Sequence, residues 1–151
     1  RDLKMKALFF TPVVAYLTFS ILYIKPYYLD YFNELVGGTG NVNERNLFQT
    51  GWWGQGLRDA GYFVIDNAKE GSSIGLAISP GHVLPKSEKL NYTEWKPNKT
   101  YDYVIVNHYH IIRDGFDDSL IKEKYTLVKK VKADGATLVY VYEKNRKDQQ
   151  N

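Results

Sequence analysis

The 151-residue sequence contains no cysteine, which excludes disulfide bonds and any thiol nucleophile such as a Cys–His pair. The absence does not decide the compartment, because many exported domains lack disulfides.

A charge surplus is also absent from most of the chain. Residues 1–25 account for the whole net charge of +3, and the 16 basic and 16 acidic side chains of residues 26–151 cancel. No basic face remains for nucleic acid, and no nucleic-acid partner is expected.

Charge is missing altogether from residues 7–24, ALFFTPVVAYLTFSILYI. Eighteen uncharged residues at a rise of about 1.5 Å each nearly match the hydrocarbon thickness of a bilayer, which predicts a transmembrane helix. A buried core helix and the apolar region of a signal peptide are the alternatives. The following residues, KPYYLDYF, contain no small-residue cleavage site, which argues against the signal peptide.

The flanking charges predict the orientation of this helix. Arg1, Lys4 and Lys6 precede the apolar run, and only Lys25 follows it. The positive-inside rule then places the N-terminus in the cytoplasm and residues 26–151 on the extracytoplasmic side of the membrane. Two glycosylation sequons, at Asn91 and Asn98, fit an exported location weakly. Because the chain begins at Arg1 without methionine, we expect a longer protein whose remainder lies N-terminal to the helix.

The exported part reads as a small α/β domain. Residues 57–68 have apolar and small side chains at helical spacing, and Gly71 follows as a stop. Residues 72–79 and 101–110 read as buried strands, and 117–125 as a short helix with an acidic start. Two β-rich runs flank Asp134-Gly135, which predicts a C-terminal hairpin. We expect a mixed sheet of roughly four strands, its first pair parallel and its last pair antiparallel.

These patterns divide the chain into four parts. Residues 1–25 form the membrane helix with its basic cytoplasmic flank, and residues 26–50 an interfacial aromatic segment ending in a glycine-rich joint. Residues 51–145 form the exported domain, and residues 146–151 a polar tail.

The glycine stretch Gly37-Gly38-Thr39-Gly40 resembles a phosphate-binding loop only in composition. A Walker loop requires a lysine and a hydroxyl residue after its glycines, and a dinucleotide-binding loop requires a preceding strand. This stretch has neither. We therefore interpret residues 27–35 as a short interfacial helix or turn, and Gly37–Gly40 as a loop that joins the membrane part to the domain.

His108 and His110 would share one face of a strand and could bind a metal with His82, but no carboxylate or cysteine at a suitable spacing completes the set. The sequence therefore assigns no metal site, and a contact to substrate, lipid headgroup or a loop remains open for both histidines. The acidic cluster Asp114, Asp117 and Asp118 lacks the ligand spacing of an EF-hand, and an acidic helix N-terminus explains it more simply.

The segment Trp52-Trp53-Gly54-Gln55 combines two tryptophans with glycines just before a helix. The tryptophans can stack on a sugar, rest at the membrane interface or anchor the core, and the sequence leaves these alternatives open. No Ser–His–Asp or paired-carboxylate arrangement is defensible, so no catalytic residue and no cofactor are assigned to this chain.

The order of an apolar helix, PYYLDYFNELVGG, a spacer and WWGQGLRDAGYFV resembles the C-terminal end of GT-C membrane glycosyltransferases, the protein-mannosyltransferase-like enzymes of glycosyltransferase family 39 type. The specific part of the likeness is Tyr27–Leu57. Many members carry an acidic residue where this chain has Trp52, which weakens any catalytic role for that segment. The closing Asp-Gly…Leu-Val-Tyr-Val-Tyr run is also similar.

The resemblance implies an enzyme that transfers a sugar from a polyprenyl-phosphate carrier to an acceptor on the extracytoplasmic side. The family's essential acidic residues lie in an exported loop that this chain does not contain, so the fragment is expected to be accessory and non-catalytic alone. The resemblance leaves open a divalent cation in the whole enzyme. Expected partners are the bilayer, the upstream helices of the same polypeptide and the carrier-linked donor. The motif positions carried over, as docking residues, are Tyr31, Asn33, Gly37, Gly38, Trp53, Gly54 and Gln55.

The competing hypothesis is a single-pass, membrane-anchored extracytoplasmic domain that binds a ligand or a partner protein and has no enzymatic activity. It predicts that the exported part folds and binds its target without other membrane helices.

Overall fold

The computed structural model of the protein describes residues 2–78 and 81–145. Arg1 and the tail expected at 146–151 lie outside these ranges. The helices are α1 (Asp2–Ile24), α2 (Gly38–Glu44), α3 (Leu57–Asn67), α4 (His108–Asp114) and α5 (Ser119–Lys124), with 3-10 turns η1 (Tyr28–Asp30), η2 (Glu34–Val36) and η3 (Gly81–Val83). The strands are β1 (Ser73–Ala77), β2 (Asn91–Glu94), β3 (Tyr103–Asn107), β4 (Tyr125–Ala133) and β5 (Ala136–Lys144).

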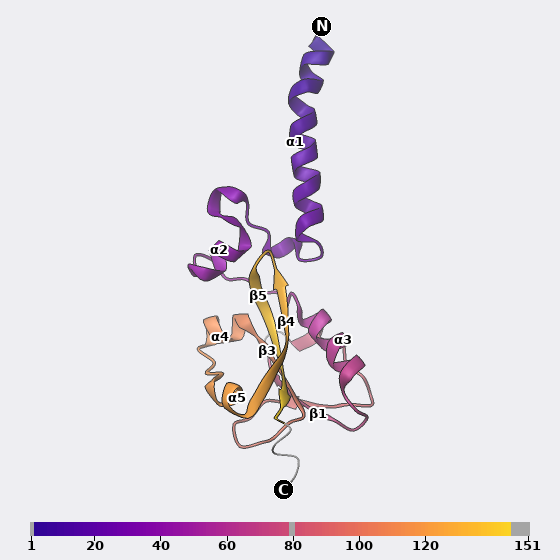
Figure 1. The fold of residues 1–151 in the computed structure, drawn as a ribbon, viewed down its shortest axis with the longest axis vertical. Coiled ribbons are helices and arrows are strands. Elements are labelled where there is room, and N and C mark those ends of the chain that lie inside the picture. Colours follow the sequence, from indigo (N-terminus) through magenta and orange to yellow (C-terminus); the bar gives the residue numbers. More distant parts are fainter. Residues whose placement is uncertain (1, 79–80, 146–151) are drawn as a thin grey trace.

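Helix α1 projects as a single rod from one end of the α/β domain (Figure 1). Within the described residues it is the one helix long and apolar enough to cross a membrane, over Met5–Ile24. Most of its apolar side chains are exposed, including Phe9 and Phe10 at 68% and 65%. That exposure is opposite to what a core helix of a soluble domain shows, since such a helix buries one face.

The described ranges form one five-stranded sheet in the order β2-β1-β3-β5-β4. Strand β1 pairs parallel with both β2 and β3, whereas β5 pairs antiparallel with β3 and with β4. The predicted α/β class, the parallel first pair and the C-terminal hairpin are confirmed. One strand more than expected is present, because β2 lies in the polar connection 80–100. Its sequence, NYTE, is mostly exposed at the sheet edge and has no apolar pattern to reveal it.

Helix α3 covers one face of the sheet (Figure 1). Its predicted apolar face is confirmed, since Leu57, Ala60 and Val64 are fully buried. They pack with side chains from four strands, namely Ile74, Tyr103, Ile105, Val131, Val139 and Val141. Gly61 of α3 meets the loop that follows η3, since a Cβ there would lie 2.8 Å from Pro85 Cδ.

Helices α4 and α5 lie on the opposite face, so the domain has three layers (Figure 1). Ile121 of α5 is fully buried against Val104 and Val106 of β3. Strand β3 is therefore covered on both faces, as its continuous apolar run predicted.

Replacing Gly75 of β1 with alanine should lower the free energy of unfolding by about 1–3 kcal/mol. A Cβ there would lie 2.8 Å from the ring of Tyr101. That ring is fixed, because Tyr101 is buried and its hydroxyl donates to the Glu94 carbonyl at 2.8 Å. The matched control is Gly81→Ala, whose nearest atom, Ile78 Cδ1, would be 3.6 Å away. Denaturant unfolding of the whole chain in detergent micelles measures both, and equal stabilities would contradict this packing.

Candidate functional site

The sheet presents the carboxyl ends of its parallel strands to the α1 end of the domain. Strand β5 runs away from the hairpin turn, and Asn107 at the end of β3 pairs with Val139, near the start of β5. Strand β1 runs parallel to β3 and ends beside it, with Ala77 opposite Val106. The hairpin turn itself points toward the C-terminal end of α1 (Figure 1). In open α/β sheets the carboxyl edge is where ligands bind, so this end of the domain is the candidate functional site.

The hairpin turn is hydrogen-bonded to helix α1 through Asp134. This residue has a left-handed backbone, with φ +42°, and Gly135 follows with φ +84°. The Asp134 Oδ2 atom accepts the Thr39 amide at 2.8 Å, and Oδ1 accepts the Tyr23 hydroxyl at 3.1 Å. We call Tyr23, Thr39 and Asp134 the Asp134 cluster. It joins α1, the glycine stretch and the last hairpin, which are far apart in the sequence.

The glycine stretch owes its composition to this contact. Gly38 has φ +75°, and a Cβ there would lie 2.5 Å from Asp134 Oδ2. A Cβ at Gly40 would lie 2.8 Å from the Asp134 carbonyl oxygen. Only glycine allows such close approach, and at Gly38 the positive φ requires it as well. The expected loop over Gly37–Gly40 is corrected, because α2 already begins at Gly38, after Gly37 in the left-handed conformation.

A second buried contact, through Asp30, binds the same segment to the domain. Asp30 is 2% exposed, and its Oδ1 accepts the Gly51 amide at 2.7 Å. Its carbonyl oxygen accepts the hydroxyl of buried Thr39 at 2.5 Å. Within the described ranges the other carboxyl oxygen, Oδ2, has no hydrogen-bond partner. Burial raises the pKa of Asp30, and the Gly51 amide opposes that shift.

Two further residues of the resemblance, Tyr31 and Asn33, shape the turn between η1 and α2. The Asn33 side chain accepts the Leu35 amide at 3.1 Å and thereby caps η2. The Tyr31 hydroxyl lies 3.5 Å from that of Tyr16 in α1. Residues 27–35 contain two 3-10 turns, which agrees with the expected short helix or turn.

The tryptophan pair is displayed on the surface. Trp52 and Trp53 are 51% and 59% exposed, and their rings stack with centroids 5.7 Å apart. Gly54 turns the chain with φ +79°, and Gln55 Oε1 accepts the Trp53 amide at 3.0 Å. Of the alternatives left open by the sequence, the core anchor is wrong. Stacking on a ligand and contact with the membrane interface both remain compatible with this exposure.

The strand expected to carry His108 and His110 ends at Asn107, and both histidines lie in α4. Residues two apart on a helix do not share a face, so the predicted pairing of these side chains is wrong. His110 Nδ1 bonds to Asp114 Oδ2 at 2.7 Å. His108 is half-buried, and burial lowers its pKa. The negative charge of Asp118 acts in the opposite direction but is the smaller effect. The His82 side chain lies outside what the structure describes.

The acidic cluster is occupied by local contacts. Asp117 Oδ1 accepts the Ser119 amide at 2.9 Å, and Asp118 pairs with Lys122 at 2.8 Å. These contacts support the expected acidic N-terminus of a short helix, which is α5. No cluster of three or more potential metal-ligating side chains occurs among the residues that could be searched.

The asparagines of the two sequons are both exposed and differ in their local structure. Asn91 lies in β2, and its amide donates to the Gly71 carbonyl at 2.9 Å. Asn98 lies in an exposed turn between β2 and β3.

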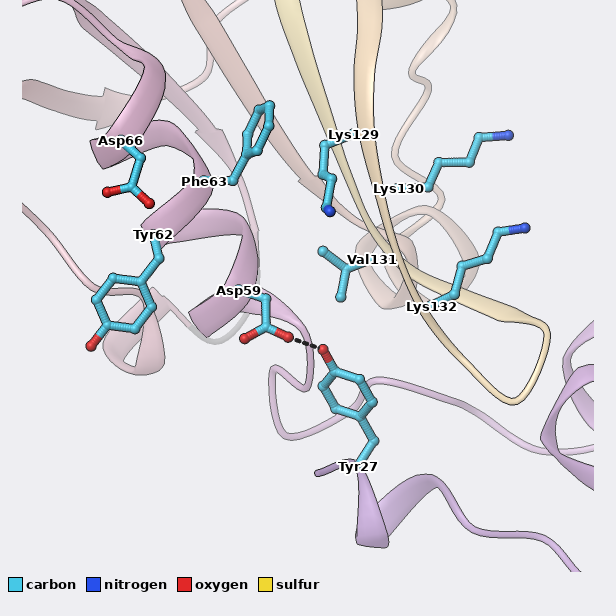
Figure 2. A pocket seen from close by; sticks show the side chains of 9 residues that line it. All are labelled: Tyr27, Asp59, Tyr62, Phe63, Asp66, Lys129, Lys130, Val131 and Lys132. Atoms are coloured by element: carbon cyan, nitrogen blue, oxygen red, sulfur yellow. Dashed lines mark hydrogen bonds between the residues drawn. The ribbon is translucent and has the colours of Figure 1, made fainter. Parts of the chain in front are cut away.

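A polar pocket of about 460 Å³ lies between α3 and β4 (Figure 2). Asp59 and Phe63 point from α3 toward the strand, and Lys129 points back between them, with Nζ 5.8 Å from the Phe63 ring centroid. Lys130 and Lys132 point away from the helix (Figure 2). The Tyr27 hydroxyl donates to Asp59, and burial together with that carboxylate raises the Tyr27 pKa. Carboxylates, an ammonium and aromatic faces suit a hydroxyl-rich polar ligand.

Comparison with protein-family models, with curated proteins and with solved structures found no match for this chain.

Sequence reasoning missed the two carboxylates that hold the site together. Asp134 was recognised only as a hairpin-turn residue, and Asp30 only as part of an aromatic segment. The single available signal was that an acid among apolar and aromatic residues, as in YYLDYF, requires a partner if it is buried. The partners of both residues are distant in sequence, so local patterns could not identify them.

Asp134→Ala should destabilise the chain by about 1–3 kcal/mol, because the part-buried Thr39 amide loses a charged acceptor and the exposed Tyr23 hydroxyl loses a weaker bond. Alanine also strains the left-handed backbone, and Asn46→Ala, at φ +51°, is the control for that strain alone. We expect Asp134→Ala to cost more and to speed hydrogen exchange of the Thr39 amide. If the two variants are equally stable and Thr39 exchanges unchanged, the Asp134 cluster contributes nothing.

Asp30→Asn should remove a pH dependence of stability. Because the folded pKa of Asp30 is raised above its ordinary 3.8, its protonated form favours folding. This contribution is fully present below the unfolded pKa and is lost as pH rises through the folded pKa. Asparagine keeps an acceptor for Gly51 without a charge, so the variant should be the more stable protein at neutral pH. Thermal unfolding in micelles from pH 3 to 8 measures this, and parallel profiles would contradict the assignment.

Proposed function

We propose that this chain is the C-terminal part of an integral-membrane glycosyltransferase, which transfers a sugar from a polyprenyl-phosphate-linked donor to an acceptor on the extracytoplasmic side. Support comes from the motif spanning Tyr27–Leu57 and from a helix able to cross a membrane, Met5–Ile24. In this proposal the N-terminus is cytoplasmic and residues 26–151 are extracytoplasmic, following the basic residues that precede α1.

The observation that carries the proposal is the Asp134 cluster. A flexible linker would let the domain drift relative to the membrane, whereas bonds from one carboxylate to both Tyr23 and Thr39 hold the domain at the end of α1. Rigid placement matters for sugar transfer, because the carrier lipid fixes the depth of the donor in the membrane. The acceptor must therefore be brought to that depth in the correct geometry. The motif residue Gly38 serves this docking, because a Cβ there would collide with Asp134.

The role of the domain is then to bind and position rather than to react. The stacked Trp52–Trp53 pair offers an aromatic surface for a sugar face, and the pocket between α3 and β4 offers carboxylates and Lys129 for hydroxyl groups. Both features flank the end of the domain that adjoins α1. The acidic residues that perform the transfer are expected in the upstream membrane part of the enzyme.

Gly38→Val in the whole enzyme should lower transfer activity by at least about tenfold, because misplacing reacting groups by even 1 Å is costly. The new Cβ would meet Asp134 Oδ2 at 2.5 Å and break the Asp134 cluster. Gly71→Val is the matched control: Gly71 also has a positive φ, +83°, but its Cβ would meet nothing within 4 Å. Asn33→Ala, which removes only an exposed cap, should have a smaller effect.

Sugar transfer is measured on membranes with radiolabelled polyprenyl-phosphate sugar, after expression has been matched by blotting. Equal activity of the Gly38→Val and Gly71→Val enzymes would contradict docking through the glycine stretch. No transfer by the unaltered whole protein with any such donor would contradict the enzymatic assignment itself.

A further inference from the structure

The charges around α1 allow one register in a bilayer. Lys6 and Lys25 bracket residues 7–24, and the span Met5–Ile24 is about 30 Å long at 1.5 Å per residue, the thickness of the hydrocarbon core. Sliding the helix by two turns in either direction would draw one lysine into the hydrocarbon, which is costly. Ile24 therefore marks one boundary of the membrane core.

The chain after α1 turns back along the helix instead of leaving the boundary. The Tyr16 hydroxyl donates to the carboxylate of Glu34 and lies 3.5 Å from the Tyr31 hydroxyl. Tyr16 precedes Ile24 by eight residues, which places these contacts about 12 Å along the helix from the boundary. In Figure 1 the segment between η1 and α2 rises beside the lower part of α1.

This turn, residues 31–37, has its backbone amides hydrogen-bonded at the tip, from Leu35 to Gly37. The Leu35 amide bonds to the Asn33 side chain, and the Val36 amide to the Asn33 carbonyl at 3.2 Å. The Gly37 amide bonds to the Glu34 carbonyl at 3.0 Å, and the Val36 carbonyl accepts the Asn41 side chain at 2.5 Å. Non-helical backbone can enter a membrane only where its polar groups are satisfied, and these bonds meet that condition for the three amides at the tip.

The tip of the turn is apolar and points away from the protein. Leu35 is 95% exposed, the largest exposure among the large hydrophobic residues of the described chain. Phe32 of the same turn stacks on Phe48, which is 63% exposed, with ring centroids 5.7 Å apart. The Glu34 carboxylate faces the Tyr16 hydroxyl instead of the tip. An exposed apolar side chain on a turn whose tip amides are hydrogen-bonded is suited to contact with lipid.

We propose that residues 31–37 form a re-entrant turn that dips beside α1 into the bilayer leaflet adjoining the domain, with Leu35 in contact with lipid acyl chains. The occupant of this surface is lipid because the surface is continuous with the membrane-spanning face of α1 and lies at its depth. The proposal rests on the bilayer placement of α1 within the proposed function, and not on glycosyl transfer.

The absence of cysteine makes depth measurement direct. Single-cysteine variants of the 151-residue chain are labelled with an environment-sensitive fluorophore and reconstituted into phosphatidylcholine–phosphatidylglycerol vesicles. The vesicles carry nitroxide quenchers on the headgroup or on the acyl chain, and iodide probes exposure to water. Leu35→Cys is the test. Phe10→Cys reports the apolar run of α1, and Leu127→Cys is an exposed leucine on β4, far from the hairpin turn.

We expect the Leu35 probe to lose most of its emission to acyl-chain nitroxide, as the Phe10 probe does, and to resist iodide. The Leu127 probe should respond to iodide alone. Because Leu35 makes almost no packing contact, its replacement leaves folding intact.

Two results would overturn the re-entrant turn while leaving α1 in the membrane. In the first, iodide quenches the Leu35 probe while acyl-chain nitroxide quenches the Phe10 probe. In the second, neither quencher reaches the Leu35 probe, which would mean that protein covers it. If acyl-chain nitroxide quenches neither the Phe10 probe nor the Leu35 probe, α1 does not lie in the membrane. That result would overturn the placement of α1 and, with it, this inference. Loss of transfer activity in the whole enzyme bears on the proposed function only.

Discussion

The carboxylate of Asp134 is the contact on which the arrangement of this protein depends. It sits at the turn of the C-terminal hairpin and accepts bonds from Tyr23 and from Thr39, thus joining the last element of the sheet to the first helix. Two further contacts join the end of α1 to the domain: Ile24 is buried in the core cluster that contains Leu57 and Val131, and the following segment is held through Asp30. The glycines at 38 and 40 exist in this position because side chains there would collide with Asp134.

Together with the buried Ile24, this contact determines which end of the domain adjoins α1. The sheet is held with the carboxyl ends of β1 and β3 toward α1, which is the edge where α/β sheets accept ligands. The exposed tryptophan pair and the polar pocket beside α3 lie around that same end. In the proposed function this edge would face the membrane, where the carrier-linked donor is held.

Several local expectations agree with the structure for identifiable reasons. Helix α3 follows from the spacing of Leu57, Ala60 and Val64, and the hairpin follows from Asp134-Gly135 between β-rich runs. The failures are equally specific. Strand β2 has only polar and aromatic residues, and its identity comes from pairing with β1. Asn107 accepts the Tyr109 amide and starts α4, which removes His108 from the strand where periodicity had placed it.

The sequence by itself determined the membrane-competent helix, the amphipathic helix α3, the buried central strand and the closing hairpin. Each of these depends on side-chain spacing within one segment, so the pattern is complete in the local sequence. Tertiary structure alone decided which acids are buried, why the glycines are required and where the tryptophans point. Those properties depend on partners such as Thr39 and Asp134, which are 95 residues apart and meet only after the chain has folded.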